Sequence, residues 1–384
     1  MVAIVATGRT GSDFLQSLLD SHPQIATFNG HFTVYSEFFL RAFTFKHHAD
    51  SVEDAADEFI GTYIYKLISR YDVQEAKDCL GEDSKQSFSL NTAEFKCHIT
   101  GLMEGVKLNS RDFLLAIYGA YQLSLGKKIE DLLVIVHHPH LDYEFRLFLK
   151  DFPSPRVIFT SREPRANFFS LVDNFRKYSK AHDNQAHVYT CLKMILQESE
   201  LADEFNLEYT TTRLEDLPRE DVVRELASWL NVDYKESMLR STWAGLDWHG
   251  DRVSKKKFSA TGWSKNRTQN DWQLGLGGLE QYVFNYIMNA RLKSYGYKAQ
   301  PITLVDSILV GVLILLPFRC ERRFMSPSYV YSVLKTGDRH ALINVFATFP
   351  FLIRRIKICY RYYWHTLINK PYSRNWLRGD QNFL

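Results

Sequence analysis

The residues best suited to chemistry lie at the start of the chain, in a glycine-containing segment between a strand and a helix. Val2 to Ala6 is a short apolar run rich in β-branched residues, which predicts a buried strand. Ser12 then opens a run with helical apolar spacing that ends at Pro23. A helix N-terminus after a glycine turn directs free backbone N–H groups at one point, where Arg9 and Thr10 add a cation and a hydroxyl. This pattern predicts a phosphate-binding loop.

The loop is not the nucleotide-kinase pattern G-x-x-x-x-G-K-[ST], because Ser12 follows Gly11 directly. It resembles the 5′-phosphosulfate loop of the sulfotransferase superfamily, roughly basic–Ser/Thr–Gly–Ser/Thr–x–aromatic, over Arg9, Thr10, Gly11, Ser12, Asp13 and Phe14. The His22-Pro23 pair is usual in the carbohydrate, tyrosyl-protein and bacterial branches. Asp13 departs from the family's hydroxyl residue, and its carboxylate suits the loop if it turns away to cap the helix. The simpler alternative is the first strand–helix unit of any α/β domain.

A second strand end predicts a second anion site. Arg156 to Thr160 has the pattern of a buried strand, and Pro164 suits the first position of a helix. In sulfotransferases, such a strand end binds the 3′-phosphate of the donor through an arginine and a serine eight residues later. Arg162 and Ser170 have this spacing, so the resemblance implies that they bind this phosphate. The alternative for Arg162 is a surface ion pair with Glu163.

Three further segments follow the order of the family, so that the resemblance covers residues 2–297. Residues 131–140 form an apolar strand that ends in a His/Pro cluster. Residues 211–232 resemble the family's R-Y-E-D-L strand and helix, with Leu214 in place of tyrosine, and their charged residues are expected to stabilise structure. Residues 262–297 resemble a terminal block whose basic loop covers the 3′-phosphate and adenine. The block implies donor contacts for Lys265 and Arg267, and either base stacking or packing for Trp263.

The resemblance implies sulfuryl transfer from 3′-phosphoadenosine 5′-phosphosulfate (PAPS) to a hydroxyl, without a metal. A general base must take the acceptor proton, and Arg9 with the loop N–H groups would stabilise the leaving phosphate. Relatives place a glutamate base shortly after the His-Pro pair, where this chain has His31. We therefore expect His31 as base, with His138 and then His140 as the competing candidates. His137 and Lys96 are alternatives for contacts to the bridging oxygen or the acceptor.

The predicted elements alternate between strand and helix, with strands near 2–6, 93–97, 132–137, 156–160 and 207–210. This order predicts a three-layer α/β fold with a central parallel sheet, like that of P-loop NTPases, and a ligand beyond the carboxyl ends of the strands. Residues 1–300 are expected to form the sulfotransferase domain. A helical, aromatic insertion at about 34–125 is expected to bind the acceptor.

Residues 301–384 differ in composition from the rest of the chain. They contain 12 Lys/Arg and 4 Asp/Glu, a net charge of +8 in a chain of +3 overall, together with 14 aromatic residues. The apolar runs 307–318 and 341–353 are each followed by basic residues and are shorter than a membrane span. Two interpretations stay open: attachment to an anionic membrane surface, or a helical pair that mediates dimerisation or covers the core. Binding of nucleic acid is the weaker interpretation, because it would give the apolar runs no role.

Composition fits a globular protein, and the five scattered cysteines indicate free thiols in a reducing compartment. The first strand begins at residue 2, so we expect no signal peptide and a cytoplasmic enzyme, peripheral on the inner face of a membrane. The expected acceptor is a hydroxyl of a carbohydrate or glycolipid, such as an exopolysaccharide or a lipid-linked glycan. The alternatives are a P-loop-type nucleotide kinase and a non-catalytic membrane scaffold with a degenerate donor site.

Overall fold

The computed structural model describes residues 1–28, 30–44, 51–69, 80–140, 142–178, 189–196, 204, 206–250, 276–322, 324–372 and 375–377. These residues form two compact units. The first contains residues 1–161, 207–268 and 375–384, and the second contains 162–206 and 269–374. In this division, the described residues 276–300 belong to the same unit as the C-terminal region.

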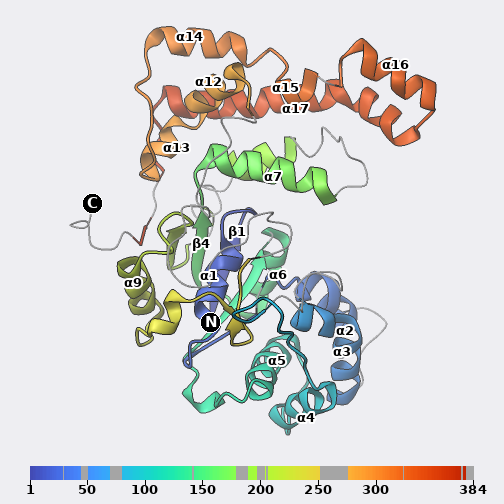
Figure 1. Ribbon diagram of the computed structural model, residues 1–384, viewed down its shortest axis with the longest axis vertical. Helices are drawn as coiled ribbons and strands as arrows, with labels where there is room; N and C mark the ends of the chain where they lie inside the picture. Colours follow the sequence, from blue (N-terminus) through green and yellow to red (C-terminus); the bar gives the residue numbers. More distant parts are fainter. Residues whose placement is uncertain are drawn as a thin grey trace. The chain divides into compact units, whose positions relative to one another are not determined.

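The first unit is built on a five-stranded parallel sheet, of which β1 and β4 are labelled in Figure 1. Its strand order is β2-β3-β1-β4-β5, with β1 (Val2–Ala6) in the centre. The other strands are β2 (Ile25–Thr27), β3 (Val134–His140), β4 (Arg156–Ser161) and β5 (Tyr209–Arg213). From β1 the chain crosses to the edge strand β2, returns to β3 beside β1, and then continues on the other side of β1 through β4 to β5. The strand order therefore reverses beside β1, which is where such sheets bind ligands.

Helices cover both faces of this sheet, as the three-layer prediction requires. On one face, α1 (Ser12–Leu19) and α9 (Glu220–Leu230) pack against the strand residues Val2, Ile4 and Ile158. On the other face, α5 (Ser110–Ser124) and α6 (Asp142–Asp151) bury aromatic side chains such as Tyr118 and Phe148. The α/β fold class expected from the sequence is therefore confirmed.

The described residues between 34 and 124 are mainly helical, and one predicted strand in this region is wrong. Residues 93–97 belong to α4 (Thr92–Leu102), because Asn91 caps the helix by accepting hydrogen bonds from the backbone N–H groups of Ala93 and Glu94. The buried positions Phe95 and Ile99 then have the four-residue spacing of one helix face. The remaining helices here are η1 (Tyr35–Phe39), α2 (Leu40–Thr44) and α3 (Val52–Ser69). Lys96 is an ion-pair partner of Asp57 on α3, at 2.6 Å.

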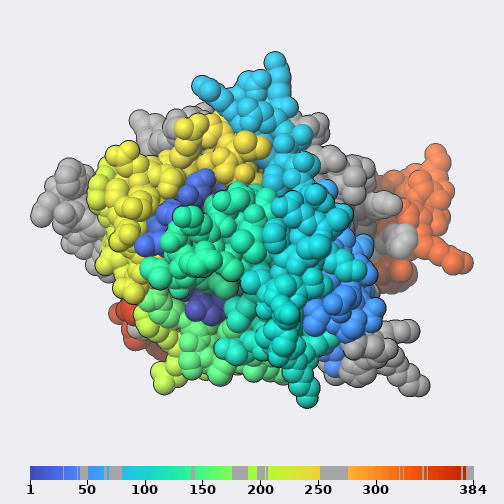
Figure 2. Space-filling view, turned by 90° about the horizontal axis from the view of Figure 1, so that it is seen from below, coloured from blue at the N-terminus to red at the C-terminus, as the bar shows by residue number. Residues whose placement is uncertain are grey.

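A short hairpin completes the first unit. Strands β6 (Thr242–Trp243) and β7 (Leu246–Asp247) pair antiparallel after the turn η3 (Glu236–Leu239). Leu80 bridges both Gln86 and Trp248, so the segment around residue 80 lies beside the hairpin, as Figure 2 shows in light blue and yellow. The edge strand β5 has a neighbour from the C-terminal segment. The backbone of Thr211 forms hydrogen bonds with the backbone of Asn375 and Leu377, so this segment lies beside β5.

The second unit is helical. It contains α7 (Pro164–Tyr178), α12 (Gly278–Ile287), α13 (Asn289–Ser294), α14 (Leu304–Leu313), α15 (Arg319–Arg322), α16 (Pro327–Thr336) and α17 (Arg339–Leu367). One core joins most of them, since buried residues of α7, α12, α13, α14 and α17 belong to a single hydrophobic cluster. The two apolar runs predicted beyond residue 301 therefore lie mainly in α14 and α17. In the part of the chain described, no helix has the length and apolar content needed to cross a membrane.

Candidate active site

The predicted phosphate loop connects β1 to α1 through three residues with positive φ. Gly8, Arg9 and Gly11 have φ of 86°, 57° and 88°, and Gly11 is the N-cap of α1. The first helical hydrogen bond runs from the Leu15 N–H to the Gly11 carbonyl at 2.9 Å. The N–H groups before Leu15 have no intrahelical acceptor in such a helix and point out of its N-terminus. The cap residue Gly11 makes no side-chain hydrogen bond to the helix, and Asp13, expected to cap it, lies in the first turn and not at the cap position.

Gly11 is also fixed by its neighbour across the sheet. A Cβ atom at this position would lie 2.5 Å from Cδ1 of Leu214, the residue that follows β5. Leu214 in turn donates its N–H to the carbonyl of Ser161 at 2.8 Å. The segment that resembles the R-Y-E-D-L motif therefore packs against the phosphate loop through Leu214. Its Arg213 and Asp216 form an ion pair with each other, the stabilising role expected for these charges.

Buried hydroxyl groups gather where the central strands end. Thr10 and Thr160 share a hydrogen bond at 2.6 Å, which ties the loop to β4. Ala6 pairs with Thr160 across the parallel strands, so Thr7 and Ser161 each lie one position further toward the carboxyl edge. The hydroxyl oxygens of Thr7 and Ser161 are buried, and neither has a hydrogen-bond partner within the described residues. Such groups are rare inside proteins and fit a ligand with hydrogen-bonding oxygens at this edge.

Gln16, on the second turn of α1, connects the two candidate bases. Its Nε2 donates to the Phe28 carbonyl at 2.5 Å, and its Oε1 accepts from the Gly30 N–H at 3.2 Å. A carbonyl can only accept and an N–H can only donate, so these two bonds fix the orientation of the amide. The same Oε1 lies 3.0 Å from Nδ1 of His138. Nδ1 of His138 must therefore carry the proton, which leaves Nε2 of the neutral ring as a proton acceptor.

His137 and His138 face opposite sides of the sheet because they are neighbours on β3. His137 is stacked on Phe148, with ring centroids 5.1 Å apart, and its Nδ1 is 3.0 Å from the Tyr118 hydroxyl. Burial lowers the pKa of His137 to about 3, so the ring stays neutral in the core. The alternative in which His137 contacts the bridging oxygen or the acceptor does not fit this position.

His138 and His31 come together at the carboxyl end of β3. Their ring centroids are 6.4 Å apart and their planes are nearly perpendicular, at 88°. The pairing of β3 with β1 is irregular between His137 and His140, where Pro139 interrupts the ladder. The carbonyl of His138 accepts the N–H of Phe32 at 2.9 Å, which holds the segment carrying His31 against the strand end. The side chain of His140 lies outside what the structure describes.

The second predicted phosphate pair belongs to the second unit. Arg162 follows the last residue of β4, and Ser170 lies on α7, which begins at Pro164. Glu163 caps this helix: its carboxylate accepts the N–H of Ala166 at 2.8 Å and forms an ion pair with Arg165. Arg165 also reaches Asn285 at 2.6 Å. Lys265, Arg267 and Trp263 lie outside the described residues.

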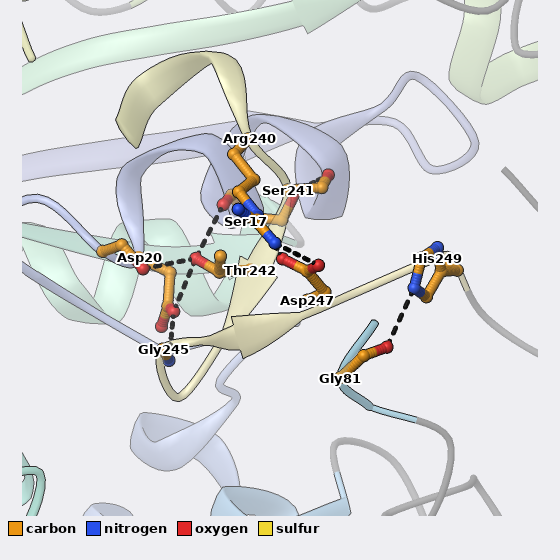
Figure 3. Close-up of polar contacts among 10 residues, drawn as sticks. Ser17, Asp20, Gly81, Arg240, Ser241, Thr242, Gly245, Asp247 and His249 are labelled. Atoms are coloured by element: carbon orange, nitrogen blue, oxygen red, sulfur yellow. Dashed lines mark hydrogen bonds and ion pairs between the residues drawn. The ribbon is translucent and has the colours of Figure 1, made fainter. Parts of the chain in front are cut away.

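The far end of α1 is anchored by a polar network, shown in Figure 3. The buried carboxylate of Asp20 accepts hydrogen bonds from the Thr242 hydroxyl and the Gly245 N–H, both at 2.9 Å. An acidic group at a helix C-terminus opposes the helix dipole, so it needs such donors. The Ser17 and Ser241 hydroxyls add a 2.7 Å contact. These bonds hold the hairpin β6–β7 against the end of α1 that is remote from the loop.

The His-Pro pair has a structural role in the same region. Nε2 of His22 lies 2.7 Å from the Asp233 carbonyl, and Nδ1 accepts the N–H of Gln24 at 3.1 Å. Both ring nitrogens are engaged in the neutral form, and burial lowers the pKa of His22. A cavity of about 380 Å³ lies nearby and is lined by residues that include Ser21, Arg240 and Asp247. It adjoins the C-terminal end of α1, so it is not the phosphate site.

Sequence reasoning missed the residues that organise this site. Gln16 lies among the apolar positions of α1 and was not singled out. A polar residue between Leu15 and Leu18, on a helix face that is buried, could have indicated a residue with a specific hydrogen-bonding role. Thr7 and Ser161 gave no such signal, because a hydroxyl at a strand end is common. Their importance follows from burial without a partner among the described residues.

A parallel sheet whose central strand leads through a glycine loop into a helix N-terminus defines the class of α/β proteins that bind phosphate groups at this junction. The sequence matches the model of the Sulfotransferase family over residues 2–232, and the chain belongs to this family. It is therefore a transferase of sulfuryl groups, and the family generally uses PAPS as its donor.

Two solved structures are similar to the chain at low identity. The sulfotransferase domain of the olefin synthase from Synechococcus PCC 7002 is 13% identical, with a TM-score of 0.36, and the match covers 83% of this chain and 94% of that one. The sulfotransferase domain from the curacin biosynthetic pathway is 13% identical, with a TM-score of 0.35, and the match covers 83% and 98% of the two chains. No curated protein matches the sequence.

Proposed function

We propose that this sulfotransferase transfers the sulfuryl group of PAPS to a hydroxyl of a carbohydrate or glycolipid, with His138 as the general base. The observation that carries the proposal is the hydrogen bond between Gln16 Oε1 and His138 Nδ1 beside the phosphate loop. It prepares Nε2 to accept a proton at the carboxyl edge of the sheet. The carbohydrate or glycolipid acceptor is supported by the likeness of the loop and its His-Pro pair to carbohydrate-type relatives.

The residues present fit a phosphosulfate group at the loop. The N–H groups of the first turn of α1 and the Arg9 side chain supply positive partners. The buried hydroxyls of Thr7 and Ser161, without partners in the described part of the chain, supply further donors. We propose that Arg162 and Ser170 bind the 3′-phosphate, on the basis of their spacing. We also propose that Lys265 and Arg267 contact the 3′-phosphate and adenine of PAPS, on the basis of the sequence resemblance.

The donor supplies an electrophilic sulfur, and the oxygen that bridges this sulfur to the 5′-phosphate leaves with the nucleotide. The acceptor oxygen forms the new bond to sulfur while the bond to the bridging oxygen breaks. His138 Nε2 takes the acceptor proton and becomes imidazolium, which the Gln16 carbonyl oxygen stabilises through Nδ1–H. Arg9 and the loop N–H groups stabilise the charge that develops on the leaving phosphate. His31 was the first choice from sequence, and we prefer His138 because its hydrogen bond to Gln16 fixes the neutral tautomer that a base needs.

Thermal unfolding with 3′,5′-ADP tests the donor assignment, with 5′-AMP and Mg-ATP as controls. A ligand that binds only the folded state stabilises it by about 2.7 kcal/mol at 100 times its Kd. We expect a shift with 3′,5′-ADP alone, which Arg9→Ala and Arg162→Ala reduce and the exposed control Arg111→Ala keeps. A shift with Mg-ATP alone would instead support a nucleotide kinase, and no shift would support a degenerate site.

Single-turnover transfer tests the base. With ³⁵S-labelled PAPS and a panel of polysaccharides and glycolipids, His138→Gln should slow transfer by about 10² to 10⁴-fold, the usual contribution of a general base. The 3′,5′-ADP shift of this variant should stay that of the native protein. If His31→Gln shows the larger loss of the two, the base is His31 and the role proposed for His138 is wrong.

A further inference from the structure

The outer face of α14 is apolar where a water-exposed helix is normally polar. Leu304, Val305, Ile308, Leu309 and Val312 are between 47% and 76% exposed. Of the 20 large hydrophobic side chains that are exposed among the described residues, 17 lie between residues 304 and 368. Apolar patches of this extent on a protein surface mark an interaction site.

The inner face of the same helix is the more polar one. Ser307 is buried, and its Oγ accepts from the Tyr286 hydroxyl at 2.9 Å. Tyr360 donates to the Gly311 carbonyl at 2.5 Å, and Tyr363 donates to the Ser307 carbonyl at 3.1 Å. Three tyrosine hydroxyls thus orient α14 with its serine and glycine toward the protein. The aliphatic side chains are consequently held outward, because turning the helix would break these bonds.

A buried arginine fixes the end of this helix. Arg355 of α17 is fully buried, donates to the carbonyls of Ile314 and Leu316, and pairs with Glu321 at 3.1 Å. The orphan carbonyls at the C-terminus of α14 are therefore satisfied within the protein. The backbone at this end of α14 therefore needs no hydrogen-bond donor from another molecule.

Positive charge surrounds the apolar face. Residues 301–384 carry a net charge of +8, and the exposed Arg319 and Arg322 follow α14 within ten residues of its end. Along α17, the exposed apolar positions Ile343, Phe346 and Ile353 are followed by exposed basic residues and then by further exposed apolar ones. The basic residues are Arg354, Lys357 and Arg361, and the later apolar ones are Trp364 and Leu367. Apolar side chains flanked by arginines match the two components of an anionic bilayer surface: the acyl boundary and the headgroups.

We propose that the outer face of α14 docks on an anionic lipid membrane and lies in its interface. Ten helical residues rise about 15 Å, half the thickness of a hydrocarbon core, which suits a helix parallel to the surface. The occupant is a lipid surface because a second protein copy would carry the same positive charge. This proposal does not depend on the donor or on the base.

Vesicle co-sedimentation tests the proposal with the full chain. Phosphatidylcholine vesicles with phosphatidylglycerol should bind the protein, and vesicles without it should bind more weakly. Ile308→Asp/Val312→Asp should reduce binding by about tenfold or more, because it removes inserted apolar area and adds repulsion. Leu133→Asp, a change at a 60% exposed leucine of the first unit, is the matched control and should bind as the native protein does.

A second variant tests the contribution of the basic residues to membrane binding. Arg319→Ser/Arg322→Ser should weaken binding to anionic vesicles by about fivefold per arginine, since each basic residue near such a surface contributes about 1 kcal/mol. Thermal unfolding of each variant shows that it is folded. Equal binding by the native protein and the aspartate variant would overturn the proposal. A dimer in light scattering that the aspartate variant dissociates, without vesicle binding, would assign the face to a second copy and overturn it as well.

Discussion

The amide oxygen of Gln16 lies 3.0 Å from Nδ1 of His138, and the same oxygen accepts the N–H of Gly30. Because the other end of the amide donates to the Phe28 carbonyl, the group has one orientation and His138 one neutral tautomer. A residue of α1 thereby fixes the tautomer of a histidine on a neighbouring strand, the histidine that we propose as the base. This relationship gives the first prediction.

Gln16→Met should leave His138 as a mixture of tautomers, and Gln16→Glu should raise its pKa, because a carboxylate stabilises imidazolium more than an amide does. Long-range ¹H–¹⁵N spectra of histidine-labelled protein report both quantities without an acceptor. In the native spectrum, the neutral His138 ring should show only the tautomer protonated on Nδ1. In single-turnover transfer, Gln16→Glu should move the acidic limb of the pH profile to higher pH. An unchanged limb and an unchanged tautomer would reduce Gln16 to a packing role.

Gly11→Ala should abolish the thermal shift caused by 3′,5′-ADP and lower the stability of the first unit. The substitution places Cβ against Leu214 and also requires φ of 88° from an alanine. Gly126→Ala is the matched control: its φ is 71°, and a Cβ there meets nothing within 4 Å. Both variants carry a backbone cost of about 1 kcal/mol, but only the first should lose the donor. Equal donor shifts in the two variants would contradict the proposed loop.

The first unit should become less stable as the pH falls below about 6.5. Burial lowers the pKa of His137 to about 3, so the unfolded chain takes up a proton in this range and the folded protein does not. Stability from this group is complete above pH 6.5 and declines toward pH 3 by about 1.4 kcal/mol per pH unit. His22 acts in the same direction. Urea unfolding at pH 7, 6 and 5 should show a flatter decline for His137→Leu, and an identical decline would disprove the assignment.

Arg355→Met should destabilise the second unit by about 3–5 kcal/mol, because it leaves Glu321 buried without its cation and two carbonyls without donors. Burial already raises the pKa of Glu321, and the charge of Arg355 opposes that rise. Arg355→Met/Glu321→Gln should recover part of the loss. Arg354→Met, at the exposed neighbouring position, should change the unfolding free energy by less than about 0.5 kcal/mol. Similar losses for Arg354→Met and Arg355→Met would refute a specific role for the buried pair.

The sequence was sufficient for four of the five strands and for the glycine loop because these depend on local patterns. The apolar runs at β1, β3 and β4 and the glycines before α1 define the junction where we propose that a phosphate binds. The strand predicted at 93–97 failed because the Asn91 cap outweighed the apolar pattern. β2 was missed since three residues, Ile25–Thr27, are too few to show a period.

The arrangement of the base could not be predicted, because it depends on contacts between distant residues. Gln16 and His138 are 122 positions apart, and only the packing of α1 beside β3 brings them together. Likewise, the roles of neighbouring His137 and His138 diverge through the alternation of the strand, which places one beside Phe148 and the other beside Gln16. A sequence motif treats the two histidines as equivalent.

Helix α1 carries the phosphate loop at its first residue and the partner of the base one turn later, and Asp20 ties its other end to the hairpin. The two chemical components are thus parts of one rigid body. We expect substitutions in the described helices between residues 34 and 124 to leave this alignment unchanged. The acceptor-binding role expected of that region would then allow the acceptor to change while Gln16, His138 and the loop keep their arrangement.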